Sequence, residues 1–239
     1  MDQPADQPEN QPREQDADQT ADDQLLHELR VRGTAPDPGE AKVENEGGEA
    51  KVENESGEAE VENEGGEAGD GLVEAASKLV ELGFAIRRRS VLMLTTAGRA
   101  EADVRFCLTG TPEAAAIQAA YDRFLPLNRA LIQICNDWQV RAGGVPNDHQ
   151  DPVYDWAVID RLVAHDGKTG PVLRSLGCRV SRFAQYRDRL RGARRHVEVD
   201  EHDWLLSPRV DSYHTVWMQL HEDLLLGLGL LRAQENADD

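Results

Sequence analysis

The sequence predicts a mainly α-helical protein with one small β-hairpin, preceded by a disordered acidic region. Three observations lead to this prediction. The first 70 residues carry 22 of the 45 acidic residues but only 5 of the 26 basic ones, and they contain few apolar side chains. One stretch, residues 84–95, alternates in the way that strands do. After residue 110, apolar residues recur at helical spacing almost throughout.

The N-terminal region divides into three predicted segments. Residues 1–22 are rich in Asp, Gln, Glu and Pro, so they cannot bury enough apolar surface to order and are expected to form a disordered acidic tail. Residues 23–33 are expected to form a short helix that ends at Gly33. The apolar side of this helix comprises Leu25, Leu26, Leu29 and Val31.

Residues 34–70 contain a nine-residue acidic repeat. The units GEAKVENEG, GEAKVENES and GEAEVENEG follow one another. Each unit offers one Val and one Ala for burial beside several charged side chains, so stacking of the units gains little. The repeat is therefore expected to stay solvated and disordered. Two alternatives are an acidic interaction tail and a mimic of nucleic-acid charge.

Residues 71–108 form the next predicted element, a helix followed by a hairpin and a second helix. The apolar face of the first helix comprises Leu72, Ala76, Leu79 and Val80, and Gly83 ends it. Two short strands then flank a basic turn at residues 88–90. Thr95 is positioned to cap the helix that follows.

The step into that helix reads Leu94-Thr95-Thr96-Ala97-Gly98-Arg99. With the basic hairpin before it, this LTxxGR step resembles the second half of MarR-type and related bacterial winged helix-turn-helix regulators. The resemblance covers about residues 71–103, with residues 23–33 as the first helix of the domain. It implies binding of duplex DNA through the recognition helix and the basic wing. The expected DNA-binding residues are Ser77, Lys78, Arg87, Arg88, Arg89 and Arg99.

Two departures from that family pattern weaken the expected DNA binding. The acidic repeat stands where family members carry a second helix. The expected recognition helix also presents Glu74 and Glu81 beside Lys78, whereas base-reading helices usually present Arg, Asn, Gln or Ser. We therefore expect DNA binding to be weakened, or autoinhibited by the tethered acidic segment.

Residues 111–231 are expected to form an α-helical bundle of about six segments, followed by a tail at 232–239. Thr111 and Asp151 are predicted helix caps, each followed by a proline. Parts of this region are similar to a helical region that follows winged helices in actinobacterial proteins of unassigned function. The bundle is expected to provide dimerisation and an effector pocket. The expected pocket residues are Asn136, Asp137, Trp138, His214, Trp217 and His221.

Three interpretations stay open for those pocket residues: a small-molecule site, polar residues that fix core packing, and a metal site. The loop motifs NDHQD and DEHDW, which begin at Asn147 and Asp200, are interpreted as helix-capping residues. Residues 182–196 carry six arginines, which suit either a solvated face or an interface for nucleic acid or an acidic partner.

The sequence contains no nucleophile elbow, phosphate loop, dinucleotide fingerprint or paired-cysteine zinc motif. We therefore expect no enzyme activity, catalytic residue, cofactor or metal. The N-terminus has no secretion signal and no apolar run approaches the length of a membrane span, so a cytoplasmic protein without membrane contact is expected.

The sequence as a whole predicts a bacterial winged-helix transcriptional regulator that forms a homodimer. The alternative is an interaction or adaptor protein that does not bind DNA, with a basic protein partner for its acidic repeat.

Overall fold

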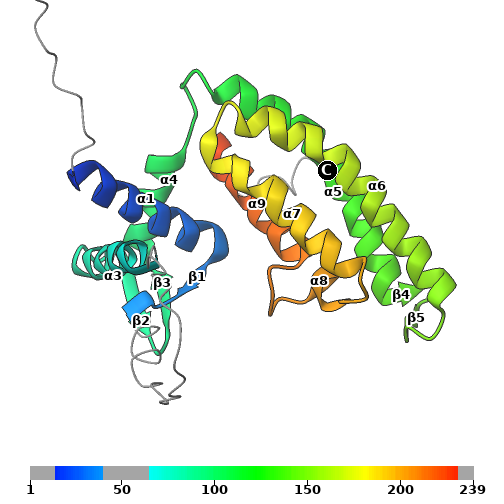
Figure 1. Ribbon diagram of the computed structural model, residues 1–239. Coiled ribbons are helices and arrows are strands. Elements are labelled where there is room, and N and C mark those ends of the chain that lie inside the picture. Colours follow the sequence, from blue (N-terminus) through cyan, green and yellow to red (C-terminus); the bar gives the residue numbers. More distant parts are fainter. Residues whose placement is uncertain (1–13, 40–64, 231–239) are drawn as a thin grey trace, which may run out of the picture. The chain divides into compact units, whose positions relative to one another are not determined.

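The computed structural model describes residues 14–39 and 65–230 of the chain. They belong to two compact units, Met1–Arg105 and Phe106–Asp239. The first is the N-terminal unit and the second the helical unit (Figure 1). The predicted mainly helical fold is confirmed, and the predicted hairpin is part of a small antiparallel sheet.

The N-terminal unit combines three helices with a three-stranded antiparallel sheet. In chain order its elements are α1 (Glu14–Arg32), β1 (Thr34–Pro36), α3 (Gly65–Glu81), β2 (Ala85–Arg88), β3 (Val91–Leu94) and α4 (Thr96–Phe106). The strand order is β1-β3-β2, so β3 lies in the middle of the sheet. The register pairs Pro36 and Arg88 with Val91 on its two sides, which leaves a two-residue turn between β2 and β3.

Apolar side chains of α1 and α3 form the core of this unit, as the sequence predicted. Leu26 and Leu29 of α1 and Ala76 of α3 are fully buried, and Leu79 is nearly so. The two helices contact each other, and α1 also contacts β1 and β3. Leu92, in the central strand β3, is fully buried.

Several predicted boundaries of the N-terminal unit were wrong. Helix α1 starts at Glu14, within the segment expected to be a disordered tail, and α3 starts at Gly65 rather than at residue 71. At the boundary between the expected tail and the expected helix, Asp22 forms an ion pair with Lys78, and Asp23 lies 2.6 Å from Arg105. Strand β1 was not predicted. Most of the acidic repeat, residues 40–64, and the predicted tail at 232–239 lie outside the described residues.

Gly33 and Gly83 end their helices as the sequence predicted, and a third glycine, Gly98, allows a close approach of two backbone segments. Gly33 and Gly83 have φ angles of +83° and +74° and follow the ends of α1 and α3. Gly98 lies at the start of α4, where a Cβ atom would stand 1.9 Å from the carbonyl oxygen of Phe84. Thr95 caps the same helix, because its Oγ1 accepts a hydrogen bond from the Gly98 N–H at 3.1 Å.

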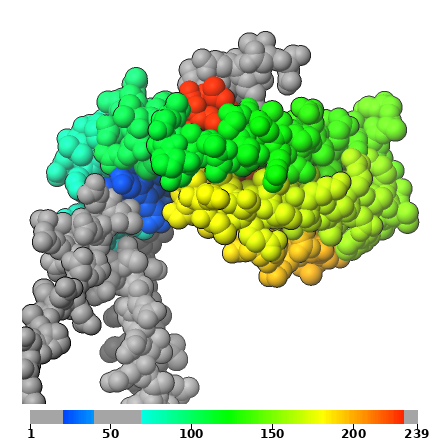
Figure 2. Space-filling view, turned by 90° about the horizontal axis from the view of Figure 1, so that it is seen from above, coloured from blue at the N-terminus to red at the C-terminus, as the bar shows by residue number. Residues whose placement is uncertain are grey.

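The helical unit is a bundle whose long helices lie side by side. Its elements are α5 (Ala114–Gln139), β4 (Val140–Arg141), β5 (Val145–Pro146), α6 (Pro152–Gly177), a 3-10 turn (Ser181–Phe183), α7 (Ala184–Val197), α8 (Asp203–Leu206) and α9 (Tyr213–Leu228). Helix α5 packs along α6, α6 along α7, and α9 packs on both α5 and α7. In Figure 2, α5 (green) and α6 (towards yellow) run next to each other.

Two helices of this unit contain an internal proline, and one of its predicted caps was wrong. Helices α5 and α6 run without interruption through Pro126 and Pro171. A proline removes one helical hydrogen bond, and buried side chains on both sides of it outweigh that loss. Thr111 does not cap α5, which starts at Ala114. Asp151 does cap α6, accepting a hydrogen bond from the Tyr154 N–H at 3.2 Å.

Candidate functional site

The turn between β2 and β3 is an exposed cationic tip. Arg88 and Arg89 are both exposed, and Arg89 adopts a left-handed conformation with φ of +52°, which a two-residue hairpin turn requires. Within residues 14–39 and 65–230, neither guanidinium has an ionic partner. Two of the predicted DNA-binding residues therefore stand free at the end of the hairpin.

Arg87, the third arginine of this run, is engaged within the unit. Its Nε atom lies 2.7 Å from a carboxylate oxygen of Asp37, whose side chain is only 3% exposed. Its Nη2 group donates a hydrogen bond to Ser77 Oγ at 3.1 Å. These contacts tie β2 to α3 and to the segment after β1. Two of the predicted DNA-binding residues, Ser77 and Arg87, therefore lie together, but they are hydrogen-bonded to each other.

The other predicted DNA-binding residues do not join the cationic tip. Lys78 forms an ion pair with Asp22 of α1. Arg99 is exposed in α4, beyond the opposite end of the hairpin. Helix α3 also exposes Glu74 and Glu81, as the sequence predicted. The free positive charge of this unit is therefore concentrated at the turn and not along the helix.

The predicted effector pocket is not assembled. Asn136, expected to face the interior, is exposed on α5. Asp137 lies 2.5 Å from Arg161 at the surface. Trp138, by contrast, is buried near the end of α5. A helix distributes consecutive residues around its axis, so three neighbours cannot share one interior face.

Trp217 and His221 lie in the packed core of the bundle. Both rings have their centroids 4.7 Å from that of Phe124. The indole Nε1 of Trp217 donates a hydrogen bond to Asn128 at 2.9 Å. His214, on another side of α9, is half-buried, and burial lowers its pKa. Of the three interpretations, polar residues that fix core packing agree with this geometry.

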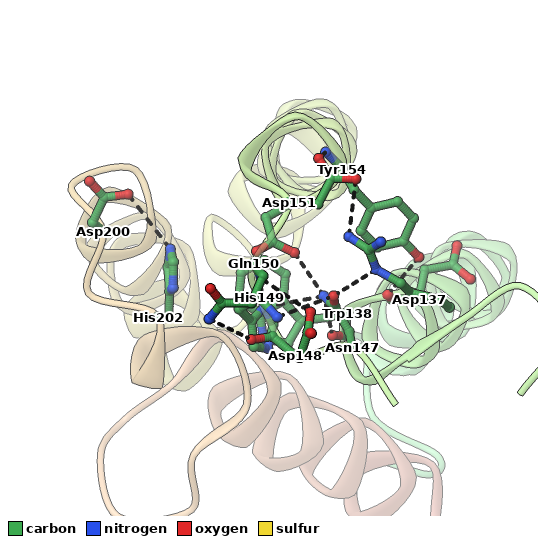
Figure 3. Close-up of polar contacts among 12 residues, drawn as sticks. Asp137, Trp138, Asn147, Asp148, His149, Gln150, Asp151, Tyr154, Asp200 and His202 are labelled. Atoms are coloured by element: carbon green, nitrogen blue, oxygen red, sulfur yellow. Dashed lines mark hydrogen bonds and ion pairs between the residues drawn. The ribbon is translucent and has the colours of Figure 1, made fainter. Parts of the chain in front are cut away.

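A polar network surrounds Trp138 where α5 connects to α6 (Figure 3). The buried carboxylate of Asp155 accepts a hydrogen bond from Asn147 Nδ2 at 2.7 Å, and its other oxygen lies 3.1 Å from Nδ1 of His149. The imidazole of His149 packs on Trp138 with a centroid distance of 4.5 Å. The edge of His202 contacts the same indole at 5.0 Å.

Asp200 joins this network through its carboxylate, which lies 3.6 Å from Nε2 of His202. His149 and Asp200 both have left-handed backbones, with φ of +57° and +65°. A carboxylate behind an imidazole is the arrangement that orients a general base. Among the described residues, however, no Ser, Thr or Cys side chain is hydrogen-bonded to His149 or His202. The contacts instead hold the α5–α6 connection: Asn147 also donates to the Trp138 carbonyl and accepts from Arg141.

Three clefts lie between helices of the bundle. One of about 330 Å³ separates the first half of α5 from the end of α6 and is floored by alanines. A second, of about 440 Å³, lies between the middle parts of the same helices, beside His165. A third, of about 150 Å³, lies between α6 and α7 and is lined by three arginines.

The described part of the chain offers neither a metal-binding cluster nor a membrane-spanning helix. Its His, Cys, Asp and Glu side chains form no group of three or more that could hold a metal ion. None of its helices is both long and apolar enough to span a membrane.

Sequence reasoning missed the Asn147–His149–Asp155 network and the arginine-lined cleft. The NDHQD motif was interpreted as a set of helix caps, which is correct for Asp151 alone. The side chains of Asn147 and His149 both contact Asp155, which lies in the first turn of α6. A carboxylate at a buried helix position, close behind a His-containing loop, was the available signal.

Comparison with known proteins gives no relative for this chain: no family model matches it, and no curated protein or solved structure does so either.

Proposed function

We propose that the chain is a transcriptional regulator whose N-terminal unit is a winged helix that contacts DNA phosphates through the β2–β3 turn. The observation that carries the proposal is the order of elements around that turn. Apart from the second helix, whose place in the sequence the acidic repeat takes, helix, strand, helix, hairpin and helix follow in the order expected for a winged helix, with β3 between β1 and β2. Arg88 and Arg89 stand at the tip, where a wing meets the DNA backbone.

The charge distribution supports weak binding that does not depend on sequence. The exposed face of α3 carries Glu74 and Glu81, which would meet the negative potential of the major groove. Arg87 and Lys78 are already paired with carboxylates. Phosphate contacts by two arginines position a protein on DNA but read no bases.

The helical unit supplies dimerisation in this proposal. Val153 and Trp156 are 81% and 43% exposed, and they lie about one turn apart near the start of α6. Exposed apolar side chains of this size at adjacent positions favour contact with a second copy.

The test is binding of a fluorescent duplex, followed by anisotropy over a salt series from about 50 to 200 mM. The full chain is compared with an Arg88→Ala/Arg89→Ala variant. Each lost phosphate contact reduces the slope of log K against log salt by about 0.9, so the double variant should lose about 2 units of slope. We expect about tenfold weaker binding at low salt.

Two further chains sharpen this test. Arg32→Ala removes an exposed cation at the end of the sheet away from the turn and should leave binding unchanged. Replacing the glutamates of residues 40–64 by glutamine should tighten binding if the repeat competes for the arginines. Equal binding by the wild type and the double variant would refute the wing contact.

A second candidate is a protein-interaction module without DNA binding. Its support is the end of α3, where Leu82, the residue after the helix, is 57% exposed next to the exposed Glu81. An exposed apolar side chain beside a carboxylate suits a protein partner with a basic surface. Absence of DNA binding by every chain above, the glutamine-substituted one included, would favour this candidate.

A further inference from the structure

The arginines of α7 differ in their partners. Two of them have carboxylate partners: Arg189 lies 3.0 Å from Asp211 and Arg194 lies 3.0 Å from Asp166. Arg182, just before the helix, lies 2.9 Å from Asp223. Arg187 and Arg191 have no carboxylate partner among the described residues. Both are nevertheless only partly exposed.

The two unpartnered arginines point into the cleft of about 150 Å³ between α6 and α7. The Arg194–Asp166 contact fixes how these antiparallel helices pair. One and two turns further along, Arg191 and Arg187 come opposite Gly170 and Arg174, and all four residues line the cleft. Arg174 also lacks a carboxylate partner in the described part of the chain. Three guanidinium groups therefore share one small space.

The floor of the cleft is built from glycine. Gly167 and Gly170 lie in α6, and a Cβ atom at either position would meet nothing within 4 Å. Glycine inside a helix lowers the stability of the helix relative to alanine. The two glycines therefore leave space in the cleft at a cost in the stability of α6. Pro171, which lines the same cleft, also withholds the N–H group that the Gly167 carbonyl would otherwise accept in the helix.

One atom of the cluster is buried and lacks a partner. The Nε–H of Arg187 is inaccessible to solvent and makes no hydrogen bond to any described residue. A buried donor without a partner is costly, and more so when it belongs to a charged group. Among the described residues that line the cleft, Asp166 alone carries a carboxylate, and this carboxylate is paired with Arg194.

We propose that the cleft formed by Arg174, Arg187 and Arg191 over Gly167 and Gly170 binds the phosphate group of a small phosphate monoester. A phosphate offers acceptor oxygens to several guanidinium forks at once and compensates their charge. The cleft volume of about 150 Å³ corresponds to about five water molecules at roughly 30 Å³ each, so the cleft has room for a single tetrahedral anion. A nucleic-acid backbone follows an open surface and does not fit into such a space.

This inference does not depend on the winged-helix proposal, because it concerns only α6 and α7 of the helical unit. The first experiment measures thermal unfolding of the full chain by tryptophan fluorescence in inorganic phosphate and in chloride at equal ionic strength. All four tryptophans belong to the helical unit, so the signal reports on it. Phosphate should raise the Tm by several degrees above the value in chloride.

Matched variants locate the site. Arg187→Gln and Arg191→Gln should each weaken phosphate binding about tenfold by calorimetric titration. Arg195→Gln removes the same charge from the exposed face of α7 and should bind as the wild type does. Gly170→Leu keeps every arginine and fills the cleft, so it should fold normally and lose the phosphate effect. In chloride, Arg187→Gln should unfold at a higher temperature than the wild type, because it relieves charge repulsion.

Three results would overturn the proposal. Phosphate could protect no better than chloride, or Arg195→Gln could lose as much affinity as Arg187→Gln, which would indicate a diffuse positive surface. The cleft variants could also weaken binding of a short duplex while free phosphate and glycerol phosphate show no binding. That last result would assign the arginines to a nucleic-acid surface instead.

Discussion

The two units of this protein hold their charged side chains in different ways. In the N-terminal unit, Asp37 beside Arg87 is buried, but two other ion pairs join helices at the surface: Arg105 and Asp23 are both more than one third exposed, and Lys78 is half exposed beside Asp22. In the helical unit, Asp223 is fully buried. It lies 2.9 Å from Arg182 and accepts a hydrogen bond from Tyr186 at 3.0 Å. Burial, and then the Asp223 charge, raise the pKa of Tyr186 well above its usual value, so the phenol remains a donor.

The difference indicates which contacts each unit cannot lose. An exposed ion pair contributes at most about 1 kcal/mol. A buried carboxylate must keep its partners, because an uncompensated buried charge costs several kcal/mol. Removing the partners of a buried carboxylate such as Asp223 should therefore act strongly, and breaking an exposed pair such as that of Asp23 with Arg105 should act weakly.

The largest expected effect is that of Asp223→Ala. The change leaves the Arg182 guanidinium, which is 19% exposed, without its carboxylate, and it removes the acceptor of Tyr186. We expect the free energy of unfolding of the helical unit to fall by about 3–5 kcal/mol. Urea denaturation followed by tryptophan fluorescence measures it. Asp23→Ala, which breaks the exposed pair with Arg105, should cost the N-terminal unit below about 1 kcal/mol, measured by hydrogen exchange in α1 and α4. Similar costs for the two changes would remove the contrast between the units.

The next largest effect is expected at Gly98 in the N-terminal unit. An alanine Cβ there would stand 1.9 Å from the carbonyl oxygen of Phe84 and 2.9 Å from its Cα. These are backbone atoms, so α4 and the sheet must move apart. We expect Gly98→Ala to cost about 3 kcal/mol, with faster hydrogen exchange in β2 and α4 and an unchanged tryptophan signal.

Gly192→Ala is the matched control in the helical unit. Gly192 lies inside α7, and a Cβ there would meet nothing within 4 Å. This change should raise stability by up to about 1 kcal/mol, because alanine favours the helix. A stabilising Gly98→Ala would show that α4 does not need its close approach to the sheet.

Local chemistry made much of the fold predictable. The caps at Thr95 and Asp151, the glycines that follow α1 and α3, and the apolar faces of those helices each depend on residues close together in sequence. The continuous passage of α5 through Pro126 could not be predicted in this way. It depends on side chains such as Phe124 and Leu131, which are buried by distant helices, and tertiary packing outweighs the local cost of proline.

The candidate sites were less predictable for the same reason. The basic hairpin was visible in the sequence, but the pairing of Arg87 with Asp37 spans 50 residues of chain. Trp217 and His221 were expected to line a pocket, and they are core residues because α5 fills the space beside them with Phe124. The arginine-lined cleft depends on the pairing of α6 with α7, which helical periodicity does not specify.

The smallest expected effect concerns pH and His165 of the helical unit. Burial lowers the pKa of His165, although a hydrogen bond with the Leu127 carbonyl acts in the opposite direction. Its ring nitrogens lie 3.1 Å from that carbonyl oxygen and 3.0 Å from the Tyr213 hydroxyl, which suits the neutral ring. Below the unfolded pKa of about 6.5, the unfolded chain binds a proton that the folded chain does not. Stability is therefore complete above that pH and falls below it, by up to about 1.4 kcal/mol per pH unit.

His165→Gln tests this dependence, because glutamine keeps hydrogen-bonding capacity and does not titrate. We expect the wild type to lose more stability than the variant between about pH 6.5 and 5, by tryptophan fluorescence in urea. His214 is also buried in part, and its lowered pKa acts in the same direction, so the variant should keep a shallower slope of its own. Exposed ion pairs of the N-terminal unit do not contribute to this signal, which comes from the helical unit alone. Equal slopes for the two chains would mean that His165 takes up its proton inside the folded bundle. The core of the helical unit would then tolerate an uncompensated charge, which is the opposite of what the Asp223→Ala prediction assumes.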